Sequence, residues 1–304
     1  MKPPRFDYLC PTSVDEALAL LAELGEDAKV LAGGQSLVPL LNFRLVRPAH
    51  LVDLNEIPDL GYIRHENGRI VIGAMTRQRA VEVSDLVSER CPLLAEAMRQ
   101  IGHVQIRNRG TIGGSLAHAD PAAELPAVVA VLGGELVMRS ARRERVMTPD
   151  EFFVAYLTTA LEPGELLVEV RFPVIAPGTG TAFMEVSRRH GDFALVGVAV
   201  CVTLDDAGVC TASAIALTGV GPTPVVARDA ARTLVGVKPT AAALEDVGRR
   251  VAETVRPDGD LHASAEYRTH VAGVLTRRAL ARAVERARGR SGRRWPTSFA
   301  TTSS

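Results

Sequence analysis

The pattern of hydrophobic and polar residues divides the chain into two parts in which strands and helices follow different orders. Residues 1–173 mix short strand-like runs with amphipathic helical stretches and hairpins. After residue 180, three long strand-like runs come first and helical stretches follow, an order typical of an α+β domain. The segment 174–180 contains Pro177 and two glycines, and we interpret it as a domain linker.

Local signals mark the elements of the first part. Ser13 and Glu16 form a capping box ahead of apolar residues at helical spacing, and Gly25 ends that helix. Asn67-Gly68 predicts a hairpin turn, and Pro149 at a first helical position predicts another helix start. The expected strands are 29–32, 51–54, the hairpin 63–73, the hairpin 135–140 with 145–147, and 166–172; the expected helices are 14–24, a turn or short helix at 37–41, one from about 76, 92–101, 122–132, and one from 149.

The second part has a simpler order. Its expected strands are 181–188, 194–204 and 209–217, and its expected helices are 224–234, 241–255 and 264–288. The polar tail 289–304 is expected to be disordered.

Composition and charge exclude several classes of function. The 47% hydrophobic and 23% charged residues are typical of a soluble globular protein. The formal net charge is zero, so no overall field attracts nucleic acid. No apolar run is long enough to span a bilayer, and the N-terminus lacks the apolar core of a signal peptide.

The four cysteines do not have the spacing of a metal or iron–sulfur site. Cys10, Cys91, Cys201 and Cys210 form no C-x-x-C pair, and we interpret them as free thiols in a reducing cytoplasm. No metal site is therefore expected in this chain, and any iron–sulfur cluster that the chemistry needs must lie on another chain.

Two glycine-rich segments carry most of the functional information. Residues 32–36 (AGGQS) and 111–115 (TIGGS) each pair two glycines with a hydroxyl, and each is expected to be a loop that follows extended residues. Glycine lets backbone N–H groups approach an anion closely. Neither segment has the pattern of a P-loop or of a dinucleotide-binding βαβ unit. Either one alone is more often a structural turn, but the two together could hold the halves of a diphosphate such as that of FAD.

Other motifs have structural interpretations of comparable or greater weight. Residues 178–183 begin like a dinucleotide fingerprint but lack its third glycine, so we interpret them as part of the linker. His118 and Asp120 could exchange a proton or simply shape a loop, and we predict no catalytic residue. Arg107 and Arg109 could pair with phosphate or be solvated.

Three stretches resemble the FAD-binding (medium) flavoprotein subunits of molybdenum hydroxylases, the carbon monoxide dehydrogenase and xanthine dehydrogenase type. Residues 29–37 (KVLAGGQSL) are similar to the first FAD-binding signature of that family. Residues 106–126 (IRNRGTIGGSLAHADPAAELP) are similar to the second, and residues 188–194 (RRHGDFA) to a further motif. The resemblance extends from about residue 6 to about residue 288.

This resemblance implies a fold and a domain organisation. The fold would be α+β, with a two-lobed FAD-binding domain of the vanillyl-alcohol-oxidase (PCMH) type at 1–175, its lobes at about 1–56 and 57–175. A smaller α+β domain at 176–288 would follow, with a three-stranded antiparallel sheet and helices, and then the tail 289–304.

The resemblance also implies cofactor contacts for particular residues. The backbone of 32–36 and 111–115 would hold the diphosphate and ribityl region of FAD, Lys29 and Val30 would line the adenine side, and Leu167 would lie against the flavin ring. The implied set of cofactor-binding residues is Lys29, Val30, Leu31, Ala32, Gly33, Gly34, Gln35, Ser36, Leu37, Ile101, Thr111, Ile112, Gly113, Gly114, Ser115, Asp120, Glu124, Leu167 and Met184.

Three of these positions depart from the family pattern. Glu124 stands where an aspartate is usual, and Ser115 replaces a frequent asparagine, although its hydroxyl can still donate a hydrogen bond. Met184 stands where members of the xanthine dehydrogenase type have lysine. The missing cation argues against an acceptor site of that type.

The implied function is that of an oxidoreductase subunit. FAD on this chain would take electrons from the [2Fe-2S] clusters of a small subunit, while a large molybdopterin subunit hydroxylates the substrate. The complex would be a cytoplasmic dimer of heterotrimers without nucleic acid. The alternatives are a self-sufficient FAD-dependent oxidase or dehydrogenase of the vanillyl-alcohol-oxidase type, and a non-catalytic assembly subunit. The substrate, and the choice among quinone, NAD and oxygen as acceptor, stay open.

Overall fold

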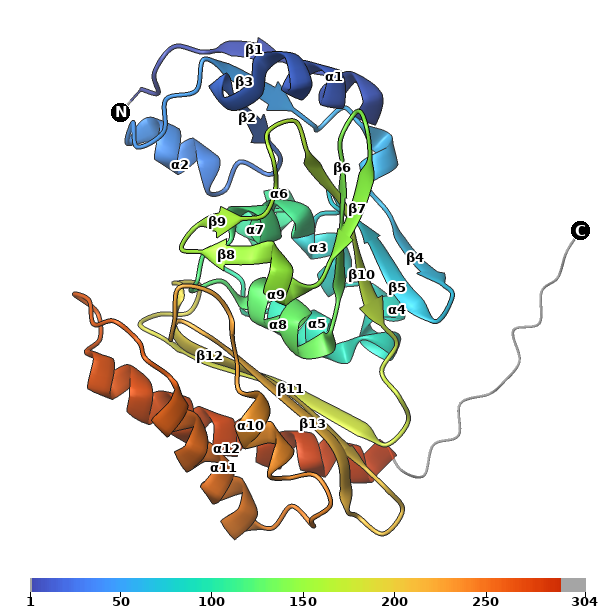
Figure 1. The fold of residues 1–304 in the computed structure, drawn as a ribbon, viewed down its shortest axis with the longest axis vertical. Helices are drawn as coiled ribbons and strands as arrows, with labels where there is room; N and C mark the ends of the chain where they lie inside the picture. The colour runs from blue at the N-terminus through green and yellow to red at the C-terminus, as the bar shows by residue number, and fades with distance from the viewer. Residues whose placement is uncertain (1, 291–304) are drawn as a thin grey trace, which may run out of the picture.

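The structure, a computed structural model, describes residues 2–290; it stacks three larger β-sheets with their helices, and a fourth sheet has only two strands (Figure 1). The N-terminal lobe (residues 2–57) lies at one end of the molecule, the central lobe (residues 58–175) in the middle, and the C-terminal domain (residues 179–290) at the other end. Among the described residues, no helix is long and apolar enough to cross a membrane.

The N-terminal lobe is a small parallel sheet with one helix packed on it. Its strands are ordered β1 (Asp7–Leu9), β3 (His50–Asp53) and β2 (Ala28–Leu31). Helix α1 (Val14–Leu24) begins where the Ser13 hydroxyl accepts the Glu16 N–H at 3.2 Å, as the capping box predicts. Its buried residues Ala17, Leu18 and Leu21 belong to the core of this lobe. The short helices η1 (Gly25–Asp27) and α2 (Leu37–Asn42) flank β2.

The central lobe is built on an antiparallel sheet of five strands. Their order is β4 (Ile63–Glu66), β5 (Arg69–Gly73), β10 (Leu166–Pro173), β6 (Glu135–Arg139) and β7 (Glu144–Met147). Both predicted hairpins, β4–β5 and β6–β7, are confirmed. The other elements are η2 (Pro58–Leu60), α3 (Gln78–Glu82), α4 (Asp85–Arg90), α5 (Pro92–Met98), α6 (Val104–Arg109), α7 (Ile112–His118), α8 (Glu124–Leu132), α9 (Pro149–Phe152), and the hairpin β8 (Phe153–Ala155) with β9 (Thr158–Thr159).

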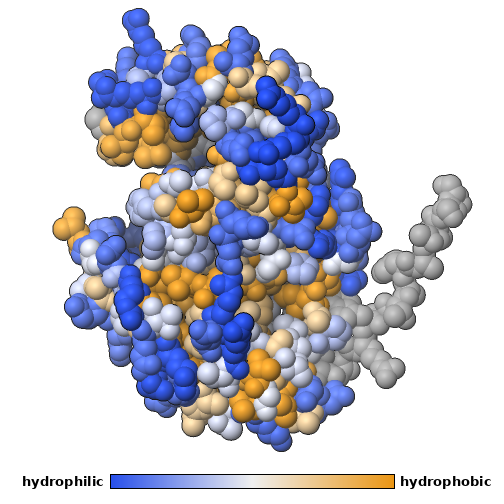
Figure 2. Space-filling view, in the orientation of Figure 1, coloured by the Kyte–Doolittle hydropathy of each residue, from blue (hydrophilic) through white to orange (hydrophobic). Residues whose placement is uncertain are grey.

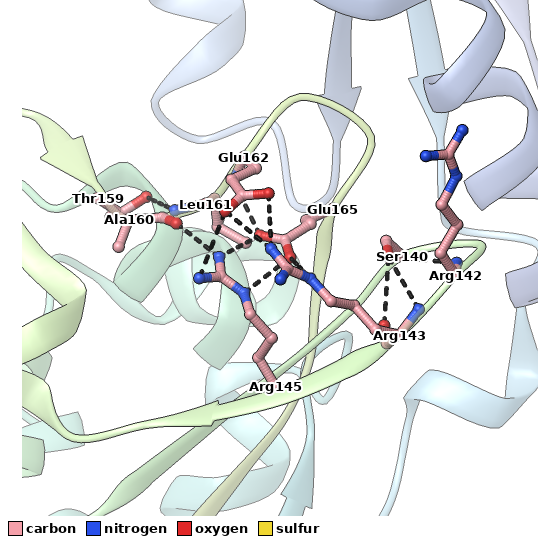
Figure 3. A network of polar contacts seen from close by, with 9 residues as sticks. All are labelled: Ser140, Arg142, Arg143, Arg145, Thr159, Ala160, Leu161, Glu162 and Glu165. Atoms are coloured by element: carbon pink, nitrogen blue, oxygen red, sulfur yellow. Dashed lines mark hydrogen bonds and ion pairs between the residues drawn. The ribbon is translucent and has the colours of Figure 1, made fainter.

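Ion pairs fasten the β6–β7 hairpin to the loop before β10 (Figure 3). Arg145 binds the buried Glu165 carboxylate with two nitrogens, at 2.8 Å and 2.5 Å. The same carboxylate accepts the Glu162 N–H at 2.9 Å, and Arg143 reaches the Glu162 side chain at 2.8 Å. Bidentate pairing of a buried carboxylate fixes geometry strongly, so this network sets the point at which β10 enters the sheet.

The C-terminal domain has four antiparallel strands, and the expectation of three was wrong. The order is β11 (Thr179–Ser187), β12 (Ala194–Leu204), β13 (Cys210–Thr218) and β14 (Val225–Val226). The short β14 lies inside the stretch expected to be helical, which retains only α10 (Arg228–Arg232). A two-residue strand is too short to show alternation, so only its pairing with β13 reveals it.

Two long helices cover one face of this sheet. They are α11 (Ala241–Thr254) and α12 (Ala265–Arg290). Residues 289 and 290 belong to α12, and the rest of the expected tail lies outside the described residues.

The C-terminal domain is fastened to the central lobe near the start of α8. The Thr218 hydroxyl lies 2.6 Å from the Pro121 carbonyl oxygen and 2.7 Å from that of Ala123. On α12, Arg286 contacts Glu96 of α5 at 2.6 Å. The Thr218 contacts hold the loop before α8 against the end of β13, and the Arg286–Glu96 pair holds α12 against α5.

Candidate functional site

The first glycine segment (residues 32–36) leaves β2 and turns into α2. Gly34 has a φ of +74°, a conformation that costs an L-residue about 1–2 kcal/mol. The N–H groups of Gly33, Gly34, Gln35 and Ser36 make no hydrogen bond to any group in the described part of the chain. Successive free N–H groups around a turn form a concavity suited to an anion.

The second glycine segment (residues 111–115) is not the loop that its sequence suggests. It opens helix α7 and follows helix α6, not extended residues, and the Thr111 hydroxyl caps the Gly114 N–H at 3.0 Å. The N–H groups of Ile112 and Gly113 donate to Thr76 and Ala74 carbonyls at 3.1 Å and 2.9 Å. The Ser115 N–H donates to the Thr111 carbonyl at 3.2 Å, so the N–H groups of residues 112–115 are all used within the protein.

The fold nevertheless brings the two segments into contact. A Cβ on Gly33 would lie 2.3 Å from the Arg109 carbonyl oxygen and 2.8 Å from Gly110 Cα. A Cβ on Gly114 would lie 3.4 Å from the Ala32 Cβ. The glycines therefore permit a close approach of two backbones from different lobes, as well as a turn.

This contact lies at the junction of the N-terminal and central lobes. Figure 2 shows a notch in the surface there, with a hydrophobic patch over α2 beside it. Exposed apolar side chains of this region are Val38, Phe43 and Leu45, with 43%, 64% and 71% of their surface accessible. A notch with an apolar wall and free N–H groups suits a ligand that is partly aromatic and partly anionic.

A pair of acidic residues lies where the central lobe meets the C-terminal domain. Glu124, the first residue of α8, is only 4% exposed. Burial, followed by the neighbouring carboxylates of Glu185 and Asp120, raises the pKa of Glu124 to about 8. Burial raises the pKa of Glu185 to about 7, and its Oε2 has no hydrogen-bond partner among the described residues. A carboxyl group that is neutral at pH 7 can donate a hydrogen bond as well as accept one.

The alternation of side chains along β11 decides which of its residues face Glu124. Met184 packs against the core of the C-terminal domain, on the face of β11 opposite to Glu185 and Phe183. The structure therefore does not bring Met184 to the acidic pair, and the sequence interpretation missed Glu185. The alternation of residues 183–186 was the signal that could have identified it.

The other cofactor-binding residues expected from the sequence range from exposed to buried. Lys29 and Gln35 are exposed, while Val30, Leu31, Ser36, Leu37 and Ser115 are half-buried. Ile101 and Leu167 belong to the core of the central lobe, at 8% and 5% exposure. Asp120 is half-buried, and its carboxylate accepts the Ala122 N–H at 2.8 Å. The structure thus joins the two glycine segments directly and places Glu124 one short loop beyond α7.

Arg107 has a structural role. It is buried and contacts Glu82 at 2.8 Å, and it donates to the carbonyls of Ile101 and Gly102 at 2.8 Å and 3.1 Å. These bonds fix the turn after α5, and with the Nη2 bond to Glu82 at 3.3 Å all three guanidinium nitrogens are engaged. Of the two arginines ahead of the second segment, only Arg109 is exposed.

The motif at 188–194 reaches the same turn from the C-terminal domain. The rings of His190 and His103 have centroids 5.7 Å apart. Gly191, with a φ of +90°, packs so closely on His103 that a Cβ there would lie 2.5 Å from the ring. This loop therefore closes against the central lobe beside Gly102.

Neither a set of metal ligands nor a cavity elsewhere in the described residues marks a different site. The described residues contain no group of three or more His, Cys, Asp or Glu that could hold a metal ion. A cavity of about 290 Å³ lies between α1 and the central sheet, and its walls include Asp15, Tyr62, Arg139 and Glu169 but neither glycine segment. Its arginines are already paired with carboxylates, so we place the candidate site at the glycine segments.

Comparison with known proteins gives matches along nearly the whole chain. Residues 4–175 match the family described as the FAD binding domain in molybdopterin dehydrogenase, and residues 181–283 match the CO dehydrogenase flavoprotein C-terminal domain. The 6-hydroxypseudooxynicotine dehydrogenase complex subunit alpha of Paenarthrobacter nicotinovorans is 46% identical over 95% of this chain and 97% of that protein. The carbon monoxide dehydrogenase medium chain of Hydrogenophaga pseudoflava is 41% identical over 92% of this chain and 97% of that protein.

A solved structure agrees with these matches. Carbon monoxide dehydrogenase from Hydrogenophaga pseudoflava, in a form that lacks the Mo-pyranopterin moiety of its molybdenum cofactor, superposes with a TM-score of 0.92 at 42% identity. The superposition covers 94% of this chain and 99% of that chain.

Proposed function

Because the chain belongs to the family of FAD-binding medium subunits of molybdenum hydroxylases, we propose that its first glycine segment holds the diphosphate of FAD. The chain is the flavoprotein subunit of a molybdenum-containing oxidoreductase, and the binding domain for FAD is its first domain. The observation that carries the proposal is the row of free N–H groups from Gly33 to Ser36 at the junction of two lobes. Bound FAD accepts electrons singly and delivers them in pairs, while the protein supplies binding, orientation and electrostatics.

The two glycine segments would contribute differently to this site. The free amides of 33–36 would donate to the diphosphate oxygens, and the second segment would form the wall that they pack against. Lys29 and Val30, on β2, would line the adenine side. Ile101 and Leu167 would contribute apolar support near the flavin ring from within the core, and Glu124 would bond a polar group of the cofactor. Met184 has no place in this arrangement because it faces the other side of β11.

The fold assignment supports the same proposal. We assign the FAD-binding domain, of the vanillyl-alcohol-oxidase (PCMH) type, to residues 1–175, with lobes at about 1–56 and 57–175. The C-terminal domain would occupy 176–288. This division places the proposed diphosphate site between the lobes, where Gly33 meets Gly110.

The proposal extends to the partners. A medium chain works with a large and a small subunit. We propose that the small subunit brings [2Fe-2S] clusters and the large subunit molybdopterin, in a cytoplasmic dimer of heterotrimers without nucleic acid. The described residues of this chain hold no cysteine cluster for an iron–sulfur centre, which supports a partner as the electron donor. We expect the small subunit to dock near the flavin edge.

Cofactor extraction and rapid mixing test the proposal. The purified chain should release FAD and not FMN, because residues 4–175 match an FAD binding domain and the free N–H groups from Gly33 to Ser36 offer donors to a diphosphate. Mixed anaerobically with organic substrates, the isolated chain should keep its oxidised flavin spectrum, and adding the iron–sulfur and molybdenum subunits should restore bleaching. Release of FMN alone would overturn the diphosphate assignment. Rapid bleaching of the isolated chain would favour a self-sufficient oxidase.

A further inference from the structure

Two side chains from different lobes connect the first glycine segment to the residues just before the second through a continuous line of hydrogen bonds. Asn55 follows β3 in the N-terminal lobe, and its Nδ2 donates to the Ala32 carbonyl at 3.0 Å. Arg77 precedes α3 in the central lobe; its Nη2 donates to Asn55 Oδ1 at 2.5 Å and its Nη1 to the Arg109 carbonyl at 2.6 Å. The line of hydrogen bonds therefore runs from Ala32, the first residue of the first segment, to Arg109, which packs on Gly33.

The bonds at the two ends act on the backbone that faces the proposed diphosphate. A trans peptide is planar, so its C=O and N–H point in opposite directions. Holding the Ala32 carbonyl against Asn55 therefore aims the Gly33 N–H away from Asn55, and the Gly33 N–H is the first of the free donors. The bond from Arg77 also fixes the position of the Arg109 carbonyl oxygen, which lies so close to Gly33 that a Cβ there would be 2.3 Å from it.

The base of this line is itself fixed. Asp53 Oδ1 accepts the Asn55 N–H at 3.0 Å, and Asp53 Oδ2 accepts the Tyr8 hydroxyl at 2.5 Å. Asp53 is only 7% exposed, at the end of β3. Asn55 thus has its backbone N–H, its amide nitrogen and its amide oxygen all engaged, which leaves its side chain one orientation.

We propose that Asn55 and Arg77 form a clamp that positions the two glycine segments for the FAD diphosphate and sets the affinity for the cofactor. The clamp rests on the proposed function. Both are positioning residues, since they bind the backbone carbonyls of Ala32 and Arg109 and leave the N–H groups of the first segment open. The planar guanidinium suits the role because it can bond two acceptors from different lobes in a fixed geometry, which a lysine ammonium does less well.

Arg77 would also contribute charge. Its guanidinium is half-buried, and burial, followed by the nearby Arg109 cation, lowers its pKa, while the Asp53 carboxylate acts in the opposite direction. Two cations beside a row of free N–H groups favour a dianionic ligand at that place.

Titration of the stripped full-length chain with FAD, followed by flavin fluorescence, tests the clamp. Arg77→Met should raise the FAD dissociation constant at least tenfold, and Arg77→Lys should recover only part of that loss. Asn55→Ala should also raise it, and the double variant should lose less than the product of the two single losses, because both act in one line of bonds.

The matched control is Arg139→Met. Arg139 also bridges the N-terminal and central lobes, through Asp15 at 2.7 Å, but it lies away from the glycine segments. It should change FAD affinity less than twofold while shifting the thermal unfolding midpoint of the FAD-free chain about as much as Arg77→Met. Equal affinity losses in both variants, or unchanged affinity in Arg77→Met, would overturn the clamp while the proposed function stands. A wild-type chain that binds no FAD would overturn both.

Discussion

The two glycine segments have nearly the same composition and opposite structures. In residues 32–36 the backbone turns through a left-handed glycine and leaves successive N–H groups free. In residues 111–115 the glycines lie in the first turn of a helix, and their N–H groups are bonded to Thr111, Ala74 and other groups of the central lobe. A Gly-Gly pair therefore has two distinct uses here: one exposes donors to a ligand, and the other removes side chains from a packed contact.

This difference can be tested because each use fails in a different way. Damage to the first segment should lower the affinity for FAD more than it lowers the stability of the fold. Damage to the second segment should lower stability and leave affinity nearly unchanged. The following predictions run from the largest expected effect to the smallest.

Gly33→Ala should have the largest effect, because Gly33 belongs to both uses. Its new Cβ would lie 2.3 Å from the Arg109 carbonyl oxygen, and backbone atoms cannot move aside as a flexible side chain can. We expect a loss of at least about 2 kcal/mol of stability and a rise of about 100-fold in the FAD dissociation constant. Calorimetry and FAD titration measure the two quantities. Gly61→Ala, whose Cβ would lie 3.7 Å from its nearest neighbour, is the control that should change neither.

Glu124→Ala tests whether the region after the second segment contributes ligand chemistry. Loss of a buried hydrogen bond to the cofactor should weaken FAD binding by about 1–3 kcal/mol, whereas Glu124→Asp should be tolerated. Unchanged FAD affinity in Glu124→Ala would show that this carboxyl group faces elsewhere.

Glu124→Gln, which keeps the shape of the neutral acid and removes its titration, has a pH signature in the FAD-free chain. The folded-state pKa of Glu124, about 8, lies above the usual value of a glutamate, so the folded state holds a proton that the unfolded state releases. Stability should therefore fall as the pH rises from about 4.5 to 8. Between pH 5 and pH 8 the wild-type chain should lose on the order of 2 kcal/mol more than Glu124→Gln. Parallel urea-unfolding curves for the two proteins would contradict the buried acid.

Gly34→Ala tests the turn of the first segment alone. At a φ of +74° an alanine costs about 1–2 kcal/mol, and a backbone that relaxes away from this φ would turn the free N–H groups aside. The FAD dissociation constant should rise about tenfold, a change of about 1.4 kcal/mol. Gly68→Ala is a close control, since Gly68 has a φ of +73° in the β4–β5 turn and open space around it. The comparison fails if both variants lose stability equally and neither loses affinity.

Thr111→Val should have the smallest effect on the cofactor. It removes the hydroxyl that caps the Gly114 N–H, which should cost about 1 kcal/mol of stability. FAD affinity should change less than threefold if the second segment serves as a wall. A tenfold loss of affinity with little change in the unfolding midpoint would show that the second segment binds the cofactor directly, and the contrast drawn between the segments would be lost.

Local sequence signals were sufficient for much of the fold. The Ser13 cap of α1, the helix start at Pro149 and the hairpin turn at Asn67-Gly68 are present as expected, although the Glu16 carboxylate accepts the Thr12 N–H and does not complete the capping box at Ser13. Each depends on hydrogen bonds or backbone conformations within a few residues, so the sequence nearby contains the whole signal. The two glycine signatures identified the family for the same reason, since their order and flanking residues can be compared directly.

Other features could be identified only in the tertiary structure, because they depend on groups that are far apart in the chain. The strand β14 exists because Val225 and Val226 pair with β13, and the second glycine segment is helical because Ala74 and Thr76 accept its first N–H groups. Arg107 became structural once the fold placed Glu82 beside it, and Glu185 became relevant once β11 turned it toward Glu124. The sequence by itself determined which residues can turn, cap, pair or carry charge. Only the folded chain decided which donors remain free, because a hydrogen-bonding group is free or engaged according to the neighbours that packing brings to it.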